Sequence, residues 1–341
     1  MRRFCYLTIV LVFILGFCGK KSTFVPTEKL PVLKLTLVSD FSTNEDLGIV
    51  GDAIITSKEE IFFFDIQKRV LYKANIKGKE VIQIGSKGEG PGEYTSIHSL
   101  IAEKDRIYAS EDKGKIMTFS TDGKFIREQK VKTTLRLVKF LGKIDGKFVL
   151  QSLTMKNNIE PYISLYTWEE NKEPNLLLEY PVTAKTTKKE ANGRIMFQII
   201  FLSFPVYAVI DKKIFASASH SYKFSFFDIS GKKISEVIMD APKPERIPYY
   251  KNSSIFKDVD FYSVLNAGTC RDKLCVISSY FRDNHPRLDV FTRQGKYLKS
   301  YIIPLDYKRP ILFSIKFQGD YLVYLTSEES GFKVYKLPEK I

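Results

Sequence analysis

The residues Ile61-Phe62-Phe63-Phe64, followed by Leu71-Tyr72 and then Lys77-Gly78-Lys79, decide the fold class. They form one run of strand-favouring residues, a second run that ends in an aromatic residue, and a glycine turn. The unit recurs, so that there are six copies along the chain. The first runs of the later copies are Ile107-Tyr108-Ala109, Phe148-Val149-Leu150, Ile214-Phe215-Ala216, Leu274-Cys275-Val276 and Leu322-Val323-Tyr324. A repeat of this kind predicts a repetitive all-β domain.

The spacing of the copies indicates four short strands in each. Four copies share a Gly-Lys turn after the second run, at Gly78, Gly123, Gly231 and Gly295, and an apolar strand follows each turn. Units of about 40 to 50 residues with four strands are typical of propeller blades. A single large sandwich would not require the register to recur in this way. We therefore predict an all-β fold, a six-bladed β-propeller, over residues 31–341.

The sixth copy lacks a strand that the N-terminal end of the domain can supply. The sixth copy stops soon after Val334-Tyr335, with too few residues left for a fourth strand. Residues 31–38 form a strand pattern that precedes the first blade, and Leu33, Leu35 and Leu37 alternate within it. These residues are therefore predicted to be the outer strand of blade six. This N-terminal strand would close the ring and cover an exposed sheet edge.

The N-terminus has the pattern of an export signal. Two arginines precede an apolar run from Phe4 to Phe17, which is shorter than the about 20 apolar residues of a membrane-spanning helix. Residues 1–17 are predicted to be a signal peptide and residues 18–30 a linker. The residues Leu15-Gly16-Phe17-Cys18 resemble a bacterial lipobox, which implies lipidation of Cys18. Phe17 departs from the small residue that normally precedes the cysteine.

A glycine-rich stretch joins the first and second copies, with the sequence Ile84-Gly-Ser-Lys-Gly-Glu-Gly-Pro-Gly-Glu-Tyr94. It resembles the blade connection of NHL-repeat-like six-bladed β-propellers, a family that includes many bacterial exported lipoproteins. The pattern of that family normally continues to a proline, where this chain has Thr95-Ser96-Ile97-His98. The resemblance implies the propeller fold and brings no catalytic motif. Because the stretch carries two glutamates and leads into a strand, a structural turn is favoured over a phosphate cradle.

The chain is basic, with 53 Lys and Arg against 39 Asp and Glu and a formal net charge of +14. Acidic residues are interleaved with the lysines, which favours a solvated surface over a nucleic-acid footprint. An exported protein would also rarely meet nucleic acid. We expect a monomer whose partner is an envelope protein or a polysaccharide, with membrane contact through the lipid anchor. Attraction to an anionic membrane surface remains an alternative.

Two cysteines, Cys270 and Cys275, flank a hairpin turn of the fifth copy. With Asp272-Lys273 at the tip of the turn they would be cross-strand neighbours, and export favours a disulfide between them over two buried thiols. His98, His220 and His285 fall in different copies without the spacing of metal ligands. No metal site and no cofactor are predicted.

The main enzymatic alternative is a lactonase-like or lyase-like propeller, in which a divalent metal lies in the central channel. Candidate ligands on predicted inner strands are Glu103, Asp260 and Asn266. Arg136 and Lys139 also fall on an inner strand, and positive charge disfavours a hard cation. A binding or scaffold protein at the cell envelope is therefore favoured, facing the periplasm or the cell surface. A purely structural envelope component is the third alternative.

The longest connections between strands emerge on one face of the predicted ring. Aromatic residues and arginines anchor many interfaces, and long loops on a rigid scaffold often carry binding sites. The candidate binding residues in these connections are Lys188, Lys189, Arg194, Arg246, Tyr249, Tyr250, Tyr280, Phe281, Arg282 and His285. The alternative is that these loops are solvated and contact no partner.

Overall fold

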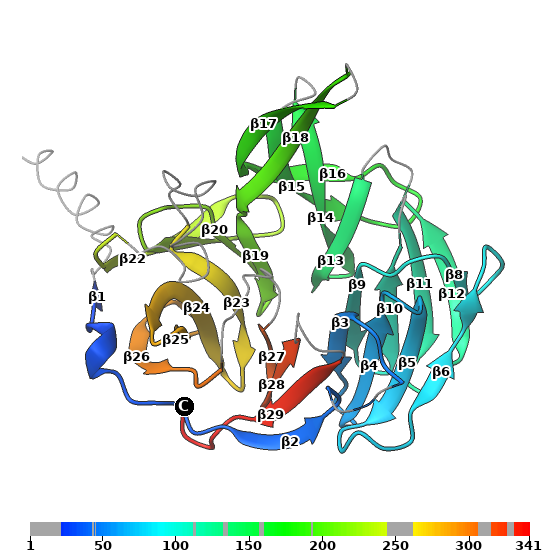
Figure 1. Cartoon of the computed structure of the whole chain (residues 1–341), viewed down its shortest axis with the longest axis horizontal. Coiled ribbons are helices and arrows are strands. Elements are labelled where there is room, and N and C mark those ends of the chain that lie inside the picture. The colour runs from blue at the N-terminus through cyan, green and yellow to red at the C-terminus, as the bar shows by residue number, and fades with distance from the viewer. Residues whose placement is uncertain are drawn as a thin grey trace, which may run out of the picture.

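Six blades surround a central channel in the computed structural model, which describes residues 22–42, 44, 46–111, 114–131, 136–156, 160–191, 194–243, 262–305, 315–325 and 331–341 (Figure 1). Blade one comprises β3 (Val50–Ile55), β4 (Glu60–Asp65), β5 (Val70–Asn75) and β6 (Ile82–Ile84). Blade two comprises β9 (Ser99–Glu103), β10 (Arg106–Ser110), β11 (Lys115–Ser120) and β12 (Phe125–Lys130). Blade three comprises β13 (Arg136–Ile144), β14 (Lys147–Lys156), β15 (Glu160–Trp168) and β16 (Asn175–Pro181).

The second half of the chain repeats this plan. Blade four comprises β19 (Val206–Ile210), β20 (Lys213–Ser217), β21 (Lys223–Phe227) and β22 (Lys233–Asp240). Blade five comprises β23 (Val264–Cys270), β24 (Lys273–Arg282), β25 (His285–Thr292) and β26 (Tyr297–Ile302). Blade six comprises β27 (Ile315–Gly319), β28 (Tyr321–Leu325), β29 (Phe332–Lys336) and, from the N-terminal side, β2 (Thr36–Asp40).

The repeated sequence units form the second and third strands of each blade. The runs that begin at Ile61 and Leu71, for example, lie on β4 and β5, which pair antiparallel. The glycines of the four Gly-Lys turns have φ angles from 77° to 88°, a conformation that residues with a Cβ adopt at a cost. The expected all-β propeller and its turn chemistry are therefore present.

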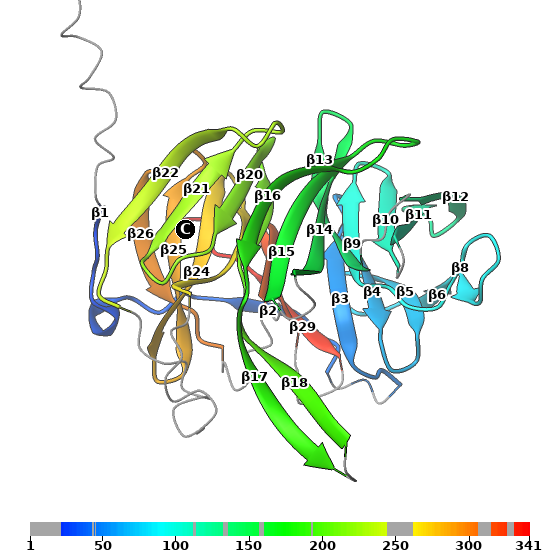
Figure 2. The same cartoon turned by 90° about the horizontal axis from the view of Figure 1, so that it is seen from above.

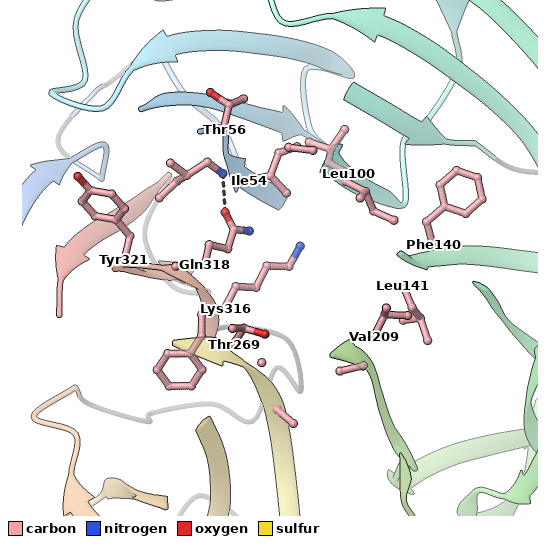
Figure 3. A pocket seen from close by; sticks show the side chains of 18 of the residues that line it. Ile54, Thr56, Leu100, Phe140, Leu141, Val209, Thr269, Lys316, Gln318 and Tyr321 are labelled. Atoms are coloured by element: carbon pink, nitrogen blue, oxygen red, sulfur yellow. Dashed lines mark hydrogen bonds between the residues drawn. The ribbon is translucent and has the colours of Figure 1, made fainter. Parts of the chain in front are cut away.

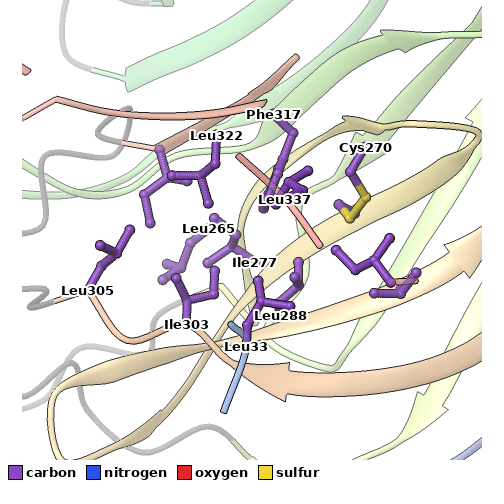
Figure 4. Close-up of a cluster of buried hydrophobic side chains, with 14 residues drawn as sticks. Leu33, Leu265, Cys270, Ile277, Leu288, Ile303, Leu305, Phe317, Leu322 and Leu337 are labelled. Atoms are coloured by element: carbon purple, nitrogen blue, oxygen red, sulfur yellow. A yellow bond between two sulfur atoms is a disulfide. The ribbon is translucent and has the colours of Figure 1, made fainter. Parts of the chain in front are cut away.

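Side chains pack between neighbouring blades and form the cores. One such cluster joins blades five and six and includes Ile277, Leu288 and Leu322, all of which are buried (Figure 4). Leu33 inserts into the same cluster from the N-terminal segment. Because the packing layers lie between blades, each blade is stabilised mainly by its two neighbours.

The sulfurs of Cys270 and Cys275 are bonded as a disulfide within this cluster, and their Cα atoms lie 5.8 Å apart. The strand register differs from the expected one. Cys270 lies opposite Lys273 and Cys275 lies opposite Gly268, so the two cysteines are diagonal neighbours. Arg271, with φ of 54°, starts the turn one residue earlier than predicted, which shifts the pairing.

The outer strand of blade six comes from the N-terminal end of the described chain. Strand β2 pairs antiparallel with β29, and Thr36 lies opposite Lys336 (Figure 1). The strand begins five residues later than the predicted range 31–38. A register shift between Leu37 and Ser39 changes the alternation, so Leu37 is 51% exposed while Val38 packs against the core. The alternation of Leu33, Leu35 and Leu37 predicts that all three point into the core, which is wrong for Leu37, whereas Leu33 is buried.

The segment before β2 lies against the outer edges of blades four and five. Strand β1 (Ser22–Thr23) pairs parallel with β22, and a 3-10 helix η1 (Thr27–Lys29) follows. The fully buried guanidinium of Arg287 lies 3.9 Å from the Phe24 ring centroid and donates to the Val25 carbonyl oxygen at 2.5 Å. The predicted linker is therefore in contact with the ring from Ser22 onwards.

The glycine-rich connection is held by its own side chains. The buried Tyr94 hydroxyl donates to the Ile84 carbonyl at 2.6 Å and accepts from the Leu71 amide at 2.9 Å. The Glu93 carboxylate turns back into the loop and accepts from the Gly90 amide at 2.8 Å. A Cβ on Gly85, which has a φ of 64°, would lie 2.7 Å from the Gly92 carbonyl oxygen, so the close turn depends on that glycine. These contacts support the interpretation of this loop as a structural connection.

The innermost strands β23 and β27 pair parallel at Thr269 and Gln318, and the other inner strands have one edge that faces the channel. Side chains from the preceding blade cap several of the inner strands. The Leu100 amide of blade two donates to Asp52 Oδ2 of blade one at 2.8 Å. The Phe140 amide of blade three donates to Ser99 Oγ of blade two at 2.7 Å. In the same way Asn266 Nδ2 of blade five donates to the Ile315 carbonyl, and the Ile55 amide donates to Gln318 Oε1 of blade six. Backbone groups that would otherwise lack partners are thereby satisfied.

Asp52 connects three blades in this arrangement. Its carboxylate accepts from the Ala53 amide of its own strand at 2.9 Å and from Leu100 of blade two. The same group forms an ion pair with Lys316 Nζ of blade six. Since Asp52 is only 3% exposed, these partners replace the water that its charge would otherwise require.

We predict that the ring depends on β2. A chain that begins at Phe41 loses four backbone-paired positions on β29, each hydrogen bond contributing about 1 kcal/mol net, and leaves an apolar edge uncovered. This truncated chain should aggregate, or its melting temperature in calorimetry should be well below that of the mature chain. A chain that begins at Pro31 keeps β2 and serves as the control, and its melting temperature should fall by less. Equal melting of the Phe41 chain and the mature chain would contradict closure by β2.

We also predict that Asp52→Ala destabilises the fold by about 3 to 5 kcal/mol, because it leaves the Lys316 ammonium buried without its counter-ion. Adding Lys316→Met should restore part of the lost stability, measured by urea unfolding, because it removes the unpaired ammonium. The recovery should be incomplete because the Leu100 amide still lacks its acceptor. Asp46→Ala removes an exposed carboxylate near the same blade and should change the stability by less than about 0.5 kcal/mol. Equal effects of Asp52→Ala and Asp46→Ala would refute the role given to Asp52.

Candidate functional site

All six innermost strands contribute to one cavity of about 670 Å³ in the central channel (Figure 3). Its wall includes residues of β3, β9, β13, β19, β23 and β27. The apolar part of the wall consists mainly of Ile54, Leu100, Phe140, Leu141 and Val209. A cavity of this volume lies within the range of about 300 to 1,000 Å³ that small-molecule sites occupy.

Two lysines bring positive charge to this cavity. Lys139 lies on β13 of blade three and Lys316 lies on β27 of blade six. Figure 3 shows the Lys316 side chain extending into the cavity from the strand that also carries Gln318. Burial lowers the pKa of Lys139 to about 8. Burial also lowers the pKa of Lys316 to about 7, and the Lys316 ammonium pairs with the Asp52 carboxylate.

The cavity reaches the face of the ring that carries the turns between first and second strands. Glu59 in blade one and Asp320 in blade six line it from those turns. Both carboxylates contact neighbouring side chains: the Tyr321 hydroxyl donates to Glu59 Oε1 at 2.5 Å, and Arg271 Nε lies 3.4 Å from Asp320 Oδ1. Among the described residues, Lys139 and Lys316 therefore line the interior, Glu59 and Asp320 lie at the mouth, and Asp52 pairs with Lys316 from outside the lining.

The candidate metal ligands do not assemble in the part of the chain that is described. Glu103 at the end of β9 is 43% exposed and lies 3.4 Å from Lys143 Nζ. The Asn266 side chain accepts from the Ala267 amide at 2.7 Å and donates to the Ile315 carbonyl. Asp260 lies outside the described residues, which contain no group of three or more His, Cys, Asp or Glu side chains placed to hold a metal ion.

The connection between blades three and four is a hairpin and not a loop. Strands β17 (Thr183–Ala191) and β18 (Arg194–Ser203) pair only with each other among the described strands. Figure 2 shows this hairpin projecting from the ring on the side where the β24–β25 turn also projects. Lys188 and Lys189 lie on β17 and Arg194 begins β18. The prediction of a prominent connection on this face is correct, but its regular pairing was not expected.

The candidates of blade five take part in internal contacts. Tyr280, Phe281 and Arg282 end β24, and His285 begins β25 after a two-residue turn. The Tyr280 hydroxyl donates to the Pro242 carbonyl at 2.6 Å, and Arg282 Nη1 donates to the Leu30 carbonyl at 2.9 Å. His285 Nδ1 lies 3.2 Å from the Leu305 carbonyl oxygen. These side chains hold adjoining segments, among them the N-terminal one. The remaining candidates, Arg246, Tyr249 and Tyr250, lie outside the described residues.

Lys139 lies on an inner strand as predicted, whereas Asp52, Lys316 and Gln318 were not identified from the sequence. A signal was present in the repeat. Asp52 and Asn266 occupy the same place in a short pattern: each lies two residues after a valine and directly before an alanine. The two sequences are Val50-Gly-Asp-Ala53 and Val264-Leu-Asn-Ala267. In both blades the strand register shifts at this point, which turns the polar side chain towards the next blade.

The fold and the sequence were compared with known proteins. A structure of a protein described as exported, from Bacteroides fragilis, has a TM-score of 0.55 and 15% identity, covering 94% of this chain and 99% of that one. A luciferin-regenerating enzyme has a TM-score of 0.50 and 12% identity, covering 90% and 96%. Virginiamycin B lyase from Staphylococcus aureus has a TM-score of 0.47 and 11% identity, covering 90% and 99%. At these identities the similarity extends to the fold alone.

No curated protein matches the sequence. A family model described as "6-bladed beta-propeller" matches residues 40–324, which include the inner strands that line the cavity, blades one to five and the first strands of blade six. The match covers most of the chain and agrees with the six blades described above, of which blades five and six join in one sheet through β23 and β27. The chain therefore belongs to this family of six-bladed β-propellers.

Proposed function

We propose that this protein is exported, is lipid-anchored at Cys18 and acts as a binding or scaffold protein at the cell envelope. The sequence supports export through the basic residues and short apolar run before Cys18. The structural similarity to a Bacteroides fragilis protein described as exported is consistent with this location. No helix among the described residues is long and apolar enough to cross a membrane.

The contacts of the N-terminal segment favour a short tether. Ser22 pairs with Met239 of blade four, and only three residues separate it from Cys18. Four residue steps span at most about 14 Å when fully extended. A lipid on Cys18 would therefore hold the ring close to the membrane surface.

The single observation that best supports a binding role is the β17–β18 hairpin. An isolated two-stranded hairpin is only marginally stable, and this one lies outside the six blades. By sequence, β18 carries Ile195, Met196 and Phe197 and then a second apolar run, Ile199 to Leu202, whereas β17 is rich in lysine and threonine. A partner that covers the apolar strand would stabilise the hairpin. This composition favours an envelope protein over a polysaccharide.

We predict that Cys18→Ser moves the protein from the membrane fraction to the soluble fraction, because each buried lipid CH₂ contributes about 0.8 kcal/mol to membrane binding. Metabolic labelling with a fatty acid should mark the wild type and not the variant. Cys5→Ser changes a cysteine within the predicted signal peptide and should leave both results unchanged. If the Cys18→Ser protein still fractionates with the membrane, lipid anchoring at Cys18 is refuted.

We predict that the partner contacts the face of the ring from which the β17–β18 hairpin projects, which we call the hairpin face. A photo-crosslinking amino acid placed at Lys188 should give a discrete adduct in intact envelopes. The same amino acid at Lys77, in an exposed turn on the opposite face, is the control and should give none. Charge reversal at Lys188, Lys189 and Arg194 should abolish the adduct formed from a probe at Thr187. Adducts at position 77 alone, or an adduct that survives charge reversal, would count against this face.

A further inference from the structure

Residues 22–30, which we call the N-terminal strap, lie against the ring in the manner of a bound peptide. Strand β1 adds to the outer edge of blade four, where Ser22 lies opposite Met239 (Figure 1). The 3-10 helix η1 then contacts β24 of blade five, and Leu30 is buried at the far end of the strap. The strap therefore crosses the outside of two neighbouring blades in an extended path.

The strap places one aromatic side chain against the ring. The centroid of the Phe24 ring lies 4.7 Å from that of Tyr280 and 3.9 Å from the guanidinium carbon of Arg287. Phe24 also packs against the buried cluster between blades four and five, to which Tyr222 and Met239 belong. An aromatic side chain at this position is therefore recognised by a cation–π contact as well as by apolar packing.

Two arginines of blade five bind main-chain oxygens of the strap. Arg287 Nη1 donates to the Val25 carbonyl oxygen at 2.5 Å. Arg282 Nη1 donates to the Leu30 carbonyl at 2.9 Å and to the Glu28 carbonyl at 3.3 Å, while the Glu28 side chain is exposed. Because every residue of a peptide offers a carbonyl oxygen, these contacts can be made to many sequences.

The ring itself holds Arg287 in position. Arg287 Nε donates to Asp289 Oδ1 at 2.7 Å, and Nη2 donates to Ser300 Oγ at 3.0 Å. Asp289 also accepts from the hydroxyl of Tyr222 at 2.5 Å and from that of Ser278 at 3.1 Å. These contacts do not involve the strap, so the site is pre-organised for a ligand. If the strap left, Nη1 would lose its acceptor, and a carbonyl of another peptide could replace it.

We propose that this part of blades four and five is a peptide-binding site which the N-terminal strap occupies as a tethered ligand. The site takes extended segments of envelope proteins in which an aromatic residue is followed by a residue whose carbonyl oxygen Arg287 binds. Two of the candidate binding residues, Tyr280 and Arg282, belong to it. The proposal goes beyond the proposed function, because the β17–β18 hairpin takes no part in this site.

Exchange of the strap for another peptide would lengthen the tether, a consequence that rests on the lipidation of Cys18. With the strap displaced, the first contact of the segment with the ring is at Pro31, whose carbonyl oxygen accepts from the Ile302 amide at 2.9 Å. The thirteen residue steps from Cys18 to Pro31 span at most about 45 Å. A partner peptide would thereby allow the ring to move away from the membrane surface.

Fluorescence anisotropy tests the site with a labelled synthetic peptide that has the sequence of residues 22–30. The protein is the full mature chain with Cys18→Ser, which carries no lipid, so failure of this test leaves the proposed anchor and the hairpin contact unaffected. A tethered ligand competes at an effective concentration in the millimolar range. Adding Phe24→Ala to the chain weakens its own strap, so this variant should bind the peptide at least about tenfold more tightly than the chain that retains Phe24.

Matched variants identify the contacts in the Phe24→Ala chain. A peptide with Phe24→Ala should bind at least about tenfold more weakly than the original peptide, whereas Phe24→Tyr and Glu28→Ala peptides should bind about as well. Adding Arg282→Ala to the chain removes two bonds to main-chain oxygens and should weaken binding about fivefold or more. Arg293→Ala changes an arginine of the same blade that pairs with Asp211 and should have no effect.

Three results would overturn the proposal: a peptide that binds both chains equally, a Phe24→Ala peptide that binds as tightly as the original, or no binding to the Phe24→Ala chain. If that chain fails to fold, hydrogen exchange in the chain with an unaltered strap provides the remaining measurement. The Leu30 amide donates to the Thr27 carbonyl within the strap at 3.2 Å. Millimolar free peptide should accelerate exchange at Leu30 and leave exchange at Leu100 unchanged, and no acceleration at Leu30 would overturn the site.

Discussion

The innermost strands of blades one to four have an edge that no other described strand covers, because the channel lies beyond it, whereas β23 and β27 of blades five and six pair with each other over a short stretch. Backbone amides and carbonyls on that edge must find other partners or remain exposed to the channel. Here side chains from the preceding blade supply them: Asp52 caps blade two, Ser99 caps blade three, and Gln318 caps blade one. Together with Asn266, which caps blade six from blade five, these caps link four pairs of neighbouring blades. They also determine which groups can line the channel, because a side chain used as a cap is no longer available to a ligand.

The need to pair these backbone groups distinguishes polar side chains with a structural role from polar side chains that are available to bind a ligand. Asn266 lies on an inner strand and has the chemistry of a metal ligand, but its amide caps the backbone of blade six. Asp52 combines a cap with an ion pair and thereby positions Lys316 at the cavity. The same reasoning applies at the outer edge. Arg282 and Tyr280 resemble interface anchors by sequence, and they hold the segments around Leu30 and Pro242 instead.

Features that repeat along the chain could be predicted from the sequence. The runs at Ile61 and Leu71, the turn glycines such as Gly78, and the shortage of strands at the C-terminal end depend on local pattern and simple counting. Lys139 was correctly placed on an inner strand for the same reason. The family match over residues 40–324 agrees with this part of the prediction.

Two one-residue shifts in strand pairing, at Leu37 and at the cysteine hairpin, could not be predicted. A register shift in β2 exposes Leu37, and a turn that starts at Arg271 changes the pairing of the two cysteines. Neither shift has a signal in residue type, because both depend on how distant strands meet. The β17–β18 hairpin was interpreted as a loop because β17 is polar along its length and lacks the alternation of a half-buried strand.

Amide hydrogen exchange at the inner edges tests the central claim most directly. The amides of Ile55, Leu100 and Phe140 donate to side chains of the preceding blade, and the account predicts that they exchange only through global unfolding of the ring. Their exchange free energies should equal the free energy of unfolding measured with denaturant. Exchange at these three amides that is as fast as in exposed turns would contradict the account.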